Sequence, residues 1–218
     1  MQEVNDLLWE RRGLRVVREH VHPIRHCLLG RSGERIERAI SHPQALAQVR
    51  HYLQSRGIEP IPFHDTAGAA RHLAEHRQMG LAAVASAAAA ARYGLDILAE
   101  SIQDDDSNRT RFLVVERGAP ARPGEGAAGF KTSLCFVSAH EPGSLVAALQ
   151  CLSTRAVNLT RLEARPIPDK PFEYRFFLDF DVTQPEVAEA ALRDLEAATH
   201  EVRLFGTYPA AATPGRAS

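Results

Sequence analysis

The chain has 218 residues, 44% of them apolar and 24% charged, with a formal net charge of −1. These proportions are typical of a soluble globular protein of one large or two ordinary domains. The neutral balance argues against a nucleic-acid partner, which needs a concentrated basic face. No run of 18 or more apolar residues occurs, so we expect no membrane partner either.

The N-terminus and the cysteines bear on location. Residues 1–13 carry acidic side chains early and lack an apolar core, so they do not form a secretory signal. Cys27, Cys135 and Cys151 are scattered and have no CxxC spacing, which favours reduced thiols. We therefore expect a cytoplasmic protein.

The first half of the chain alternates strands with short helices. A helix over Val4–Arg12 is expected to pack through Val4, Leu7 and Leu8, and Gly13 ends it. Strands are expected over 14–17, 22–29, 35–40, 58–63, 80–85 and 95–102, and helices over 41–56, 65–77 and 86–93. This alternation predicts an α/β domain with a largely parallel sheet.

The start of the predicted helix over 41–56 carries neutral polar groups. Ser41, Pro43 and Gln44 fit a capping box, with Ser41 as the N-cap. Ser41, Gln44 and Gln48 also share one stripe of this helix. They either satisfy the helix end or form part of an anion site there, and the two interpretations are compatible.

A second polar group opens an apolar strand. Three aspartates, Asp104–Asp106, lead into Ser107–Phe112, which contains Thr110 between Arg109 and Arg111. Guanidinium groups and a hydroxyl at the mouth of a strand fit an anion site. The alternative is a solvated junction between a loop and a strand.

The histidines raise the question of a metal. His20 and His22 would face one side of a strand, with His26 nearby, but Pro23 bends the segment and neither cysteine nor carboxylate completes a ligand set. The sequence also lacks a phosphate-binding loop and a dinucleotide glycine fingerprint. We therefore predict neither a metal site nor a cofactor.

The second half of the chain has a different order of elements. Residues 117–129 are rich in Gly, Pro and Ala and predict a linker. Strands are expected over 131–139, 159–167, 174–182 and 201–205, and helices over 143–156 and from 185. This order is the βαββαβ arrangement of a ferredoxin-like fold.

Two segments of this second half carry candidate binding groups. Gly143–Val146 lies at the junction of the first strand and helix, where backbone N–H groups can hold a carboxylate. Glu163 and Arg165 share one face of the second strand. An ion-paired strand surface explains the latter pair equally well.

Four segments, in this order, resemble one family. They are Ser41-His42-Pro43-Gln44-Ala45-Leu46-Ala47-Gln48, Asn108-Arg109-Thr110-Arg111-Phe112, Gly143-Ser144-Leu145-Val146 and Glu163-Ala164-Arg165-Pro166. Together they are similar to prephenate dehydratase with a C-terminal ACT domain, and the resemblance covers nearly the whole chain.

The resemblance implies a fold and domain boundaries. Residues 1–116 would form part of a two-lobed catalytic domain like a periplasmic binding protein, and 130–209 the ACT domain. Residues 117–129 would be the linker and 210–218 a disordered tail. The family's first strand and its Gly-rich and Pro-Ile-Glu-Asn segments have no counterpart here, so the resemblance implies an N-terminally incomplete catalytic domain.

The resemblance also implies an activity, the conversion of prephenate to phenylpyruvate in phenylalanine biosynthesis. Thr110 matches the essential threonine of the family and would act on the departing ring hydroxyl. Ser41, Gln44, Gln48 and Arg111 would bind the substrate. The sequence does not separate prephenate from arogenate as the substrate.

Regulation is implied in the same way. L-Phenylalanine would bind the ACT domain in a homodimer or homotetramer. The residues that match the family's two effector segments are Gly143, Ser144, Leu145, Val146, Glu163 and Arg165, and Asn158, just before the second strand, fits the family pattern as well. Ser144 and Ala164 replace an alanine and a serine of the family pattern. The alternatives are a non-catalytic phenylalanine sensor and an inactive fragment.

Overall fold

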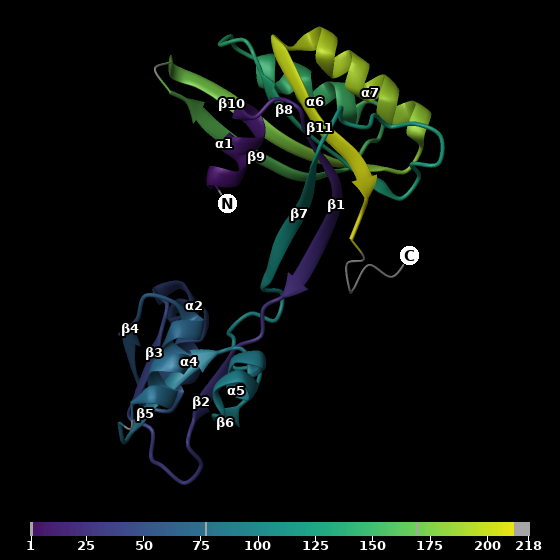
Figure 1. The fold of residues 1–218 in the computed structure, drawn as a ribbon. Helices are drawn as coiled ribbons and strands as arrows, with labels where there is room; N and C mark the ends of the chain where they lie inside the picture. The colour runs from purple at the N-terminus through teal and green to yellow at the C-terminus, as the bar shows by residue number, and fades with distance from the viewer. Residues whose placement is uncertain (1, 77, 169, 212–218) are drawn as a thin grey trace. The chain divides into compact units, whose positions relative to one another are not determined.

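The computed structural model describes residues 2–76, 78–168 and 170–211, without the side chains of residues 2 and 3. It divides into two compact units, one formed by Met1–Val21 with Arg111–Ser218 and the other by His22–Thr110. The chain passes between them in two paired strands, β1 (Leu14–Pro23) and β7 (Arg109–Arg117) (Figure 1). None of the described helices has the length and apolar character needed to cross a membrane.

The unit His22–Thr110 is built on a five-stranded sheet with the order β4-β3-β5-β2-β6. Its strands are β2 (Cys27–Gly30), β3 (Arg38–Ser41), β4 (Glu59–Pro62), β5 (Leu81–Ala85) and β6 (Asp96–Ala99). Its helices are α2 (Pro43–Gln48), α3 (Arg50–Ser55), α4 (Thr66–Glu75) and α5 (Ala87–Tyr93).

This sheet is mixed, whereas we predicted a largely parallel one. Strand β3 is parallel to β4 and β5, but β2 is antiparallel to its neighbours β5 and β6. Helices connect β3 to β4, β4 to β5 and β5 to β6, as same-direction strands require. No helix separates β2 from β3, so β2 is free to run the other way.

Helices cover both faces of this sheet. On one face α4 and α5 pack against alternate residues of β2 and β5 such as Leu29 and Ala83. On the other face α2 and α3 pack against the intervening residues, such as Leu28 and Val84. The small side chains of β5 let both helical layers approach closely, which explains why Leu81–Ala85 is buried throughout.

The helix ends follow the sequence in two cases and depart from it in one. Asp65 and Ser86 cap α4 and α5, which lie within the predicted helices over 65–77 and 86–93, and Gly94 ends α5 in the left-handed conformation. The predicted helix over 41–56 is instead broken at Val49 into α2 and α3. Its N-cap is His42, whose Nδ1 accepts from the N–H of Gln44, so the predicted capping box is wrong.

The other unit contains a four-stranded antiparallel sheet with the order β11-β8-β10-β9. Its elements are β8 (Phe130–Val137), α6 (Ser144–Ser153), β9 (Leu159–Ile167), β10 (Lys170–Val182), α7 (Pro185–Ala198) and β11 (Glu201–Pro209). The predicted βαββαβ order is confirmed. Strand β10 begins before the expected 174–182, and β11 ends after the expected 201–205.

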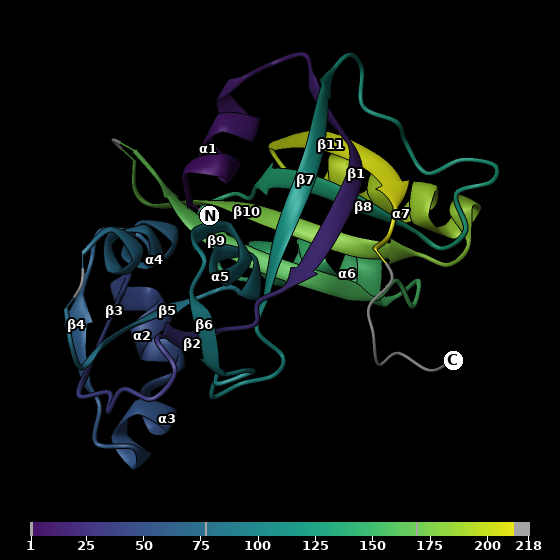
Figure 2. The ribbon, with the colours of Figure 1, turned by 60° about the horizontal axis from the view of Figure 1, so that its bottom comes forward.

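The two faces of this sheet have different partners. Helices α6 and α7 cover one face, where Phe176, Leu178 and Phe180 are buried as their alternation predicts (Figures 1 and 2). The strands β1 and β7 and the helix α1 (Gln2–Glu10) lie across the other face. We call these the helix face and the strand face.

Close packing on the strand face depends on a glycine. Gly206 interrupts the register of β11 with φ +151°, and a Cβ there would lie 2.4 Å from the backbone oxygen of Val16 in β1. Only glycine allows this approach.

Helix α1 packs on the strand face with a different set of residues than predicted. Leu8 is buried against Val16 and Phe177, but Val4 and Leu7 are half exposed. The polar Asn5 is buried in their place.

The segment expected as a linker is attached to this unit. The N–H of Thr207 donates to the backbone oxygen of Ala121, and Arg122 forms ion pairs with Glu189 and Glu196 of α7. The compact units are defined by packing and not by the family's domains, so they do not test the predicted boundaries 1–116, 117–129 and 130–209. Those boundaries remain predictions. Most of the predicted tail, residues 212–218, lies outside the described residues.

Candidate functional site

In the unit His22–Thr110, Gln48 joins a network of polar groups. Its side-chain oxygen lies 2.8 Å from Nε2 of His26, and its backbone oxygen accepts from the N–H of Asp104 at 2.7 Å. The N–H of His26 donates to Gln103, which in turn donates to Asp106. These contacts fix the end of α2 to the loop that precedes β7.

Two cavities adjoin this network. One of about 290 Å³ is lined by Ala47, Gln48, Asp104, Asp105 and Asn108. Another of about 240 Å³ is lined by His22, Pro23, Ile24, Arg25, His26, Thr66, Ala67, Ala85, Ser86 and Ala89. His26 lines the second cavity, which contains a guanidinium and two hydroxyl groups, and it contacts Gln48, which lines the first, acidic cavity.

The other predicted substrate residues of this unit lie apart from that network. Ser41 is fully buried, and its hydroxyl donates to the backbone oxygen of Val84 at 2.6 Å. This bond ties the end of β3 to β5. Gln44 is exposed on α2. The structure thus places Gln48 at a cavity and gives Ser41 a structural contact.

Thr110 and Arg111 lie side by side in β7, at the point where the chain leaves one compact unit for the other. Thr110 is partly exposed and follows Asn108, which lines the acidic cavity, by two residues. Arg111 belongs to the unit formed by Met1–Val21 with Arg111–Ser218. The predicted roles of both residues remain predictions.

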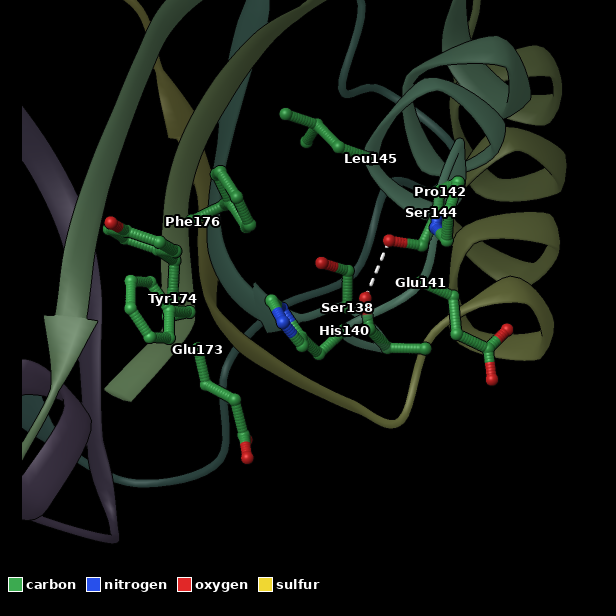
Figure 3. A pocket seen from close by; sticks show the side chains of 11 residues that line it. Ser138, His140, Glu141, Pro142, Ser144, Leu145, Glu173, Tyr174 and Phe176 are labelled. Carbon is green, nitrogen blue, oxygen red and sulfur yellow. Dashed lines mark hydrogen bonds between the residues drawn. The ribbon is translucent and has the colours of Figure 1, made fainter. Parts of the chain in front are cut away.

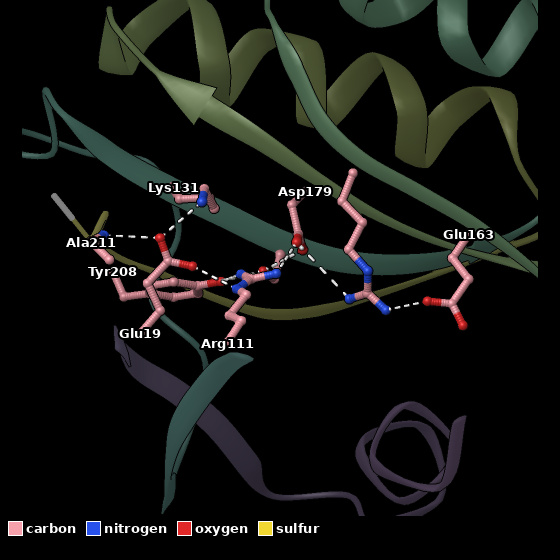
Figure 4. Close-up of polar contacts among 9 residues, drawn as sticks. Glu19, Arg111, Lys131, Glu163, Asp179, Tyr208 and Ala211 are labelled. Atoms are coloured by element: carbon pink, nitrogen blue, oxygen red, sulfur yellow. Dashed lines mark hydrogen bonds and ion pairs between the residues drawn. The ribbon is translucent and has the colours of Figure 1, made fainter. Parts of the chain in front are cut away.

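Arg111 is engaged on the strand face by three partners. Its Nε donates to Glu19 at 2.6 Å, Nη1 donates to Asp179, and Nη2 donates to the hydroxyl of Tyr208 at 2.6 Å (Figure 4). Glu19 also accepts from Lys131 at 2.8 Å and from the N–H of Ala211 at 2.9 Å. All three donor nitrogens of Arg111 are therefore used within the protein.

The charges of this cluster stabilise one another. Burial disfavours the charged guanidinium, but Asp179, Tyr208 and Glu19 outweigh it and raise the pKa of Arg111. Burial likewise opposes the carboxylate of Glu19, but the hydrogen bond from Lys131, with further help from Ala211 and Arg111, lowers its pKa. Burial and the charge of Asp179 raise the pKa of Tyr208, which stays a neutral phenol.

A separate cavity of about 370 Å³ lies at the start of α6 (Figure 3). Gly143, the N-cap, has φ +84°, and the hydroxyl of Ser144 donates to the backbone oxygen of Ala139 at 2.6 Å. The cavity is lined by Ser138, Ala139, His140, Glu141, Pro142, Ser144, Leu145, Phe172, Glu173, Tyr174 and Phe176. It combines aromatic surface with carboxylates, a combination that suits a zwitterion with an apolar side chain.

The remaining predicted effector residues do not line this cavity. Glu163 pairs with Arg161 at 2.6 Å, and Arg165 pairs with Asp6 of α1 at 2.8 Å. The amide of Asn158 donates to Asp181 at 3.0 Å. Val146 is exposed. Within one chain, the first effector segment adjoins the cavity and the second faces α1.

Several contact residues were not predicted. His26 was considered only as a metal ligand. Its contact with Gln48 could not be predicted, because the two residues are 22 positions apart in the chain. Asp179 and Arg161 look like solvated strand residues in the sequence. No group of three or more metal-ligating side chains occurs among the residues that the structure describes.

The family model described as prephenate dehydratase matches residues 1–120. The chain belongs to the prephenate dehydratase family. It is 42% identical over 212 residues to arogenate dehydratase/prephenate dehydratase 2, chloroplastic, from Arabidopsis thaliana, covering 91% of this chain and 55% of that protein. The chain spans about half the length of the curated relatives it matches.

Two solved structures are also similar. Prephenate dehydratase from Arthrobacter aurescens, in complex with L-Phe, has a TM-score of 0.80 and 30% identity over 98% of this chain and 74% of its own. GqqA, described as a novel type of quorum quenching acylase, has a TM-score of 0.80 and 38% identity over 97% of this chain and 77% of its own. The mixed α/β fold is therefore that of prephenate dehydratase structures.

The predicted cytoplasmic location is contradicted. Relatives from Arabidopsis thaliana are described as chloroplastic. The prediction rested on cysteines without a disulfide pattern, and reduced thiols do not identify which reducing compartment holds a protein.

Proposed function

We propose that this protein is a dehydratase of phenylalanine biosynthesis that converts prephenate to phenylpyruvate, with loss of water and carbon dioxide. The observation that carries the proposal is the family match over residues 1–120, which includes Thr110 and Gln48. The cavity lined by His26 supports it, because it contains Arg25 and hydroxyl groups suited to a carboxylate.

The proposed chemistry is a decarboxylative elimination. The bond between the ring and its carboxylate breaks, and its electron pair completes the aromatic ring as carbon dioxide leaves. The ring hydroxyl departs as water after it takes a proton. Thr110 hydrogen-bonds to that hydroxyl, and Gln48 and Arg25 hold the substrate's polar groups. A positioned donor of this kind contributes roughly 10²–10⁴-fold to a rate.

The test is phenylpyruvate formation from prephenate, measured for this chain and for a version extended to the length of its relatives. Absence of turnover by both folded proteins contradicts the proposal. The same assay with arogenate, followed by phenylalanine formation, decides between the two substrates. Both names occur among the relatives, so either outcome is compatible with the family.

We also propose that residues 130–209 form an ACT regulatory domain that binds L-phenylalanine. The cavity beside Gly143 and Ser144 supports this, with Leu145 and Phe176 for the ring and Glu141 and Glu173 for the ammonium group. A homodimer or homotetramer through this domain would let the segment with Glu163 and Arg165 reach a cavity of another copy. Calorimetry with L-phenylalanine and light scattering test binding and assembly. A non-binding monomer contradicts both.

A second candidate function is hydrolysis of an acyl amide. The observation behind it is that GqqA, described as a quorum quenching acylase, is 38% identical to this chain with a TM-score of 0.80. Incubation of the same preparation with an N-acylated amine decides the point. Release of the free amine without phenylpyruvate formation from prephenate supports the acylase.

A further inference from the structure

An unbroken series of polar contacts runs along the strand face, from the second effector segment to the catalytic strand. Glu163 accepts from Arg161 at 2.6 Å, and the guanidinium of Arg161 lies 3.9 Å from Asp179. Asp179 accepts from Arg111, which also donates to Glu19 (Figure 4).

Strand pairing builds this series. Arg161 of β9 lies directly opposite Asp179 of β10, and Ser133 of β8 lies opposite Asp179 on the other side. The hydroxyl of Ser133 donates to Asp179 at 2.5 Å. The register of three strands therefore places Asp179 between a guanidinium and a hydroxyl, with Arg111 above it from β7.

Burial makes these contacts interdependent. The side chains of Glu19 and Asp179 are 1% and 3% exposed, so neither carboxylate has water to replace a lost partner. Removing one partner of a buried pair leaves an uncompensated charge. A change at Arg161 therefore alters how strongly Asp179 holds Arg111.

Arg111 is joined to the candidate catalytic residue through the backbone of β7. It directly follows Thr110, and its three nitrogen donors are bound to β1, β10 and β11. Those three strands therefore hold Arg111, near the start of β7, in place.

We propose that the series Glu163–Arg161–Asp179–Arg111 couples effector binding at the four-stranded sheet to the strand that carries Thr110. Arg111 is a positioning residue in this scheme, because its donors face Glu19, Asp179 and Tyr208. This inference rests on the proposed function for the identity of the effector and of Thr110. Its physical basis is a discrete set of contacts that an effector can bias, as coupling between sites requires.

The experiment measures hydrogen–deuterium exchange of peptides covering β7, with and without saturating L-phenylalanine, in the full chain. Calorimetry in parallel measures L-phenylalanine binding. We expect L-phenylalanine to change exchange in β7 at least twofold in the wild-type protein. In Arg161→Gln we expect the dissociation constant to stay within threefold, while the change in β7 disappears.

Arg161→Gln is the main variant because the side chain of Arg161 is 26% exposed, against 3% for that of Asp179. Asp179→Asn tests the next contact, and Arg161→Lys, which keeps the charge, should restore part of the response. Arg155→Gln is the matched control, since Arg155 pairs with Asp194 between α6 and α7. It should respond to L-phenylalanine as the wild-type protein does.

Three results overturn the proposal: no binding of L-phenylalanine, binding without a change in β7, or an unchanged response in Arg161→Gln. None of these readouts requires turnover. Failure of the dehydratase assay with an intact exchange response therefore overturns the proposed function alone. Where turnover is present, Arg111→Lys should lower kcat and leave KM within twofold, whereas a substrate-binding role would raise KM.

Discussion

The two faces of the four-stranded sheet differ in the contacts that stabilise them. The helix face is apolar, with Phe176, Leu178 and Phe180 packed under α6 and α7. The strand face mixes an apolar cluster around Leu8 and Phe177 with buried charges centred on Arg111. The helix face therefore stabilises the fold by burial, and the strand face adds contacts that depend on geometry and charge. Such contacts are easier to switch than apolar packing.

The largest expected effect is on the strand face. Arg111→Met should lower the free energy of unfolding by about 3–5 kcal/mol, because it leaves the buried Glu19 and Asp179 without their shared partner. Urea unfolding followed by the fluorescence of Trp9, the only tryptophan, measures this. Trp9 reports on the unit that contains Arg111, because its ring packs under the guanidinium of Arg175 in that unit. A loss below about 1 kcal/mol would show that the cluster contributes little.

The matching change on the helix face is Leu178→Ala. Leu178 is fully buried, so the cavity should destabilise the unit by about 2–5 kcal/mol. Unlike Arg111→Met, this loss should not change with salt, because it removes no charge. Met79→Ala, at a residue 84% exposed, is the control and should change stability by less than about 0.5 kcal/mol. A strong salt dependence for Leu178→Ala would contradict the distinction between the faces.

A smaller effect should appear with pH. The pKa of Glu19 is lowered in the folded protein, so its ionisation contributes stability above its ordinary pKa, near 4.5. This contribution is lost as the pH falls through the lowered value. The stability difference between the wild-type protein and Glu19→Gln should therefore be larger at pH 7 than at pH 3.

The smallest effect is expected for an exposed ion pair on the helix side. Arg155 and Asp194 are 38% and 45% exposed, so Arg155→Gln should cost at most about 1 kcal/mol. High salt should reduce even that difference. A loss as large as that of Arg111→Met would mean that burial does not separate the two classes of ion pair.

The same contrast explains how far the sequence predicts the molecule. The alternation of Phe176, Leu178 and Phe180 within the predicted strand over 174–182 marks the helix face, because apolar residues at a spacing of two share one side of a strand. Asp179 and Arg161, between such residues, look like solvated positions. Nothing local indicates that Asp179 meets Arg111, which is 68 residues away in the chain.

The candidate catalytic unit shows a similar limit. The predicted helices over 65–77 and 86–93 contain α4 and α5, whose ends are set by the local caps Asp65, Ser86 and Gly94. The break at Val49 and the contact of Gln48 with His26 lie beside the loop before β7. That loop binds Gln48 through Asp104 and His26 through Gln103. Motif order identified the family, but the side-chain partners of Ser41 and Arg111 required the structure.

The central claim is that Thr110 serves a dehydratase reaction. The most direct measurement is phenylpyruvate formation from prephenate by the extended protein and its Thr110→Val variant. The variant should lose at least about 100-fold in kcat, because it keeps the shape of the side chain but lacks the donor. Thr110→Ser should retain more activity, and Thr154→Val, at an exposed position after α6, should be unaffected. Turnover by Thr110→Val at the wild-type rate would contradict the claim.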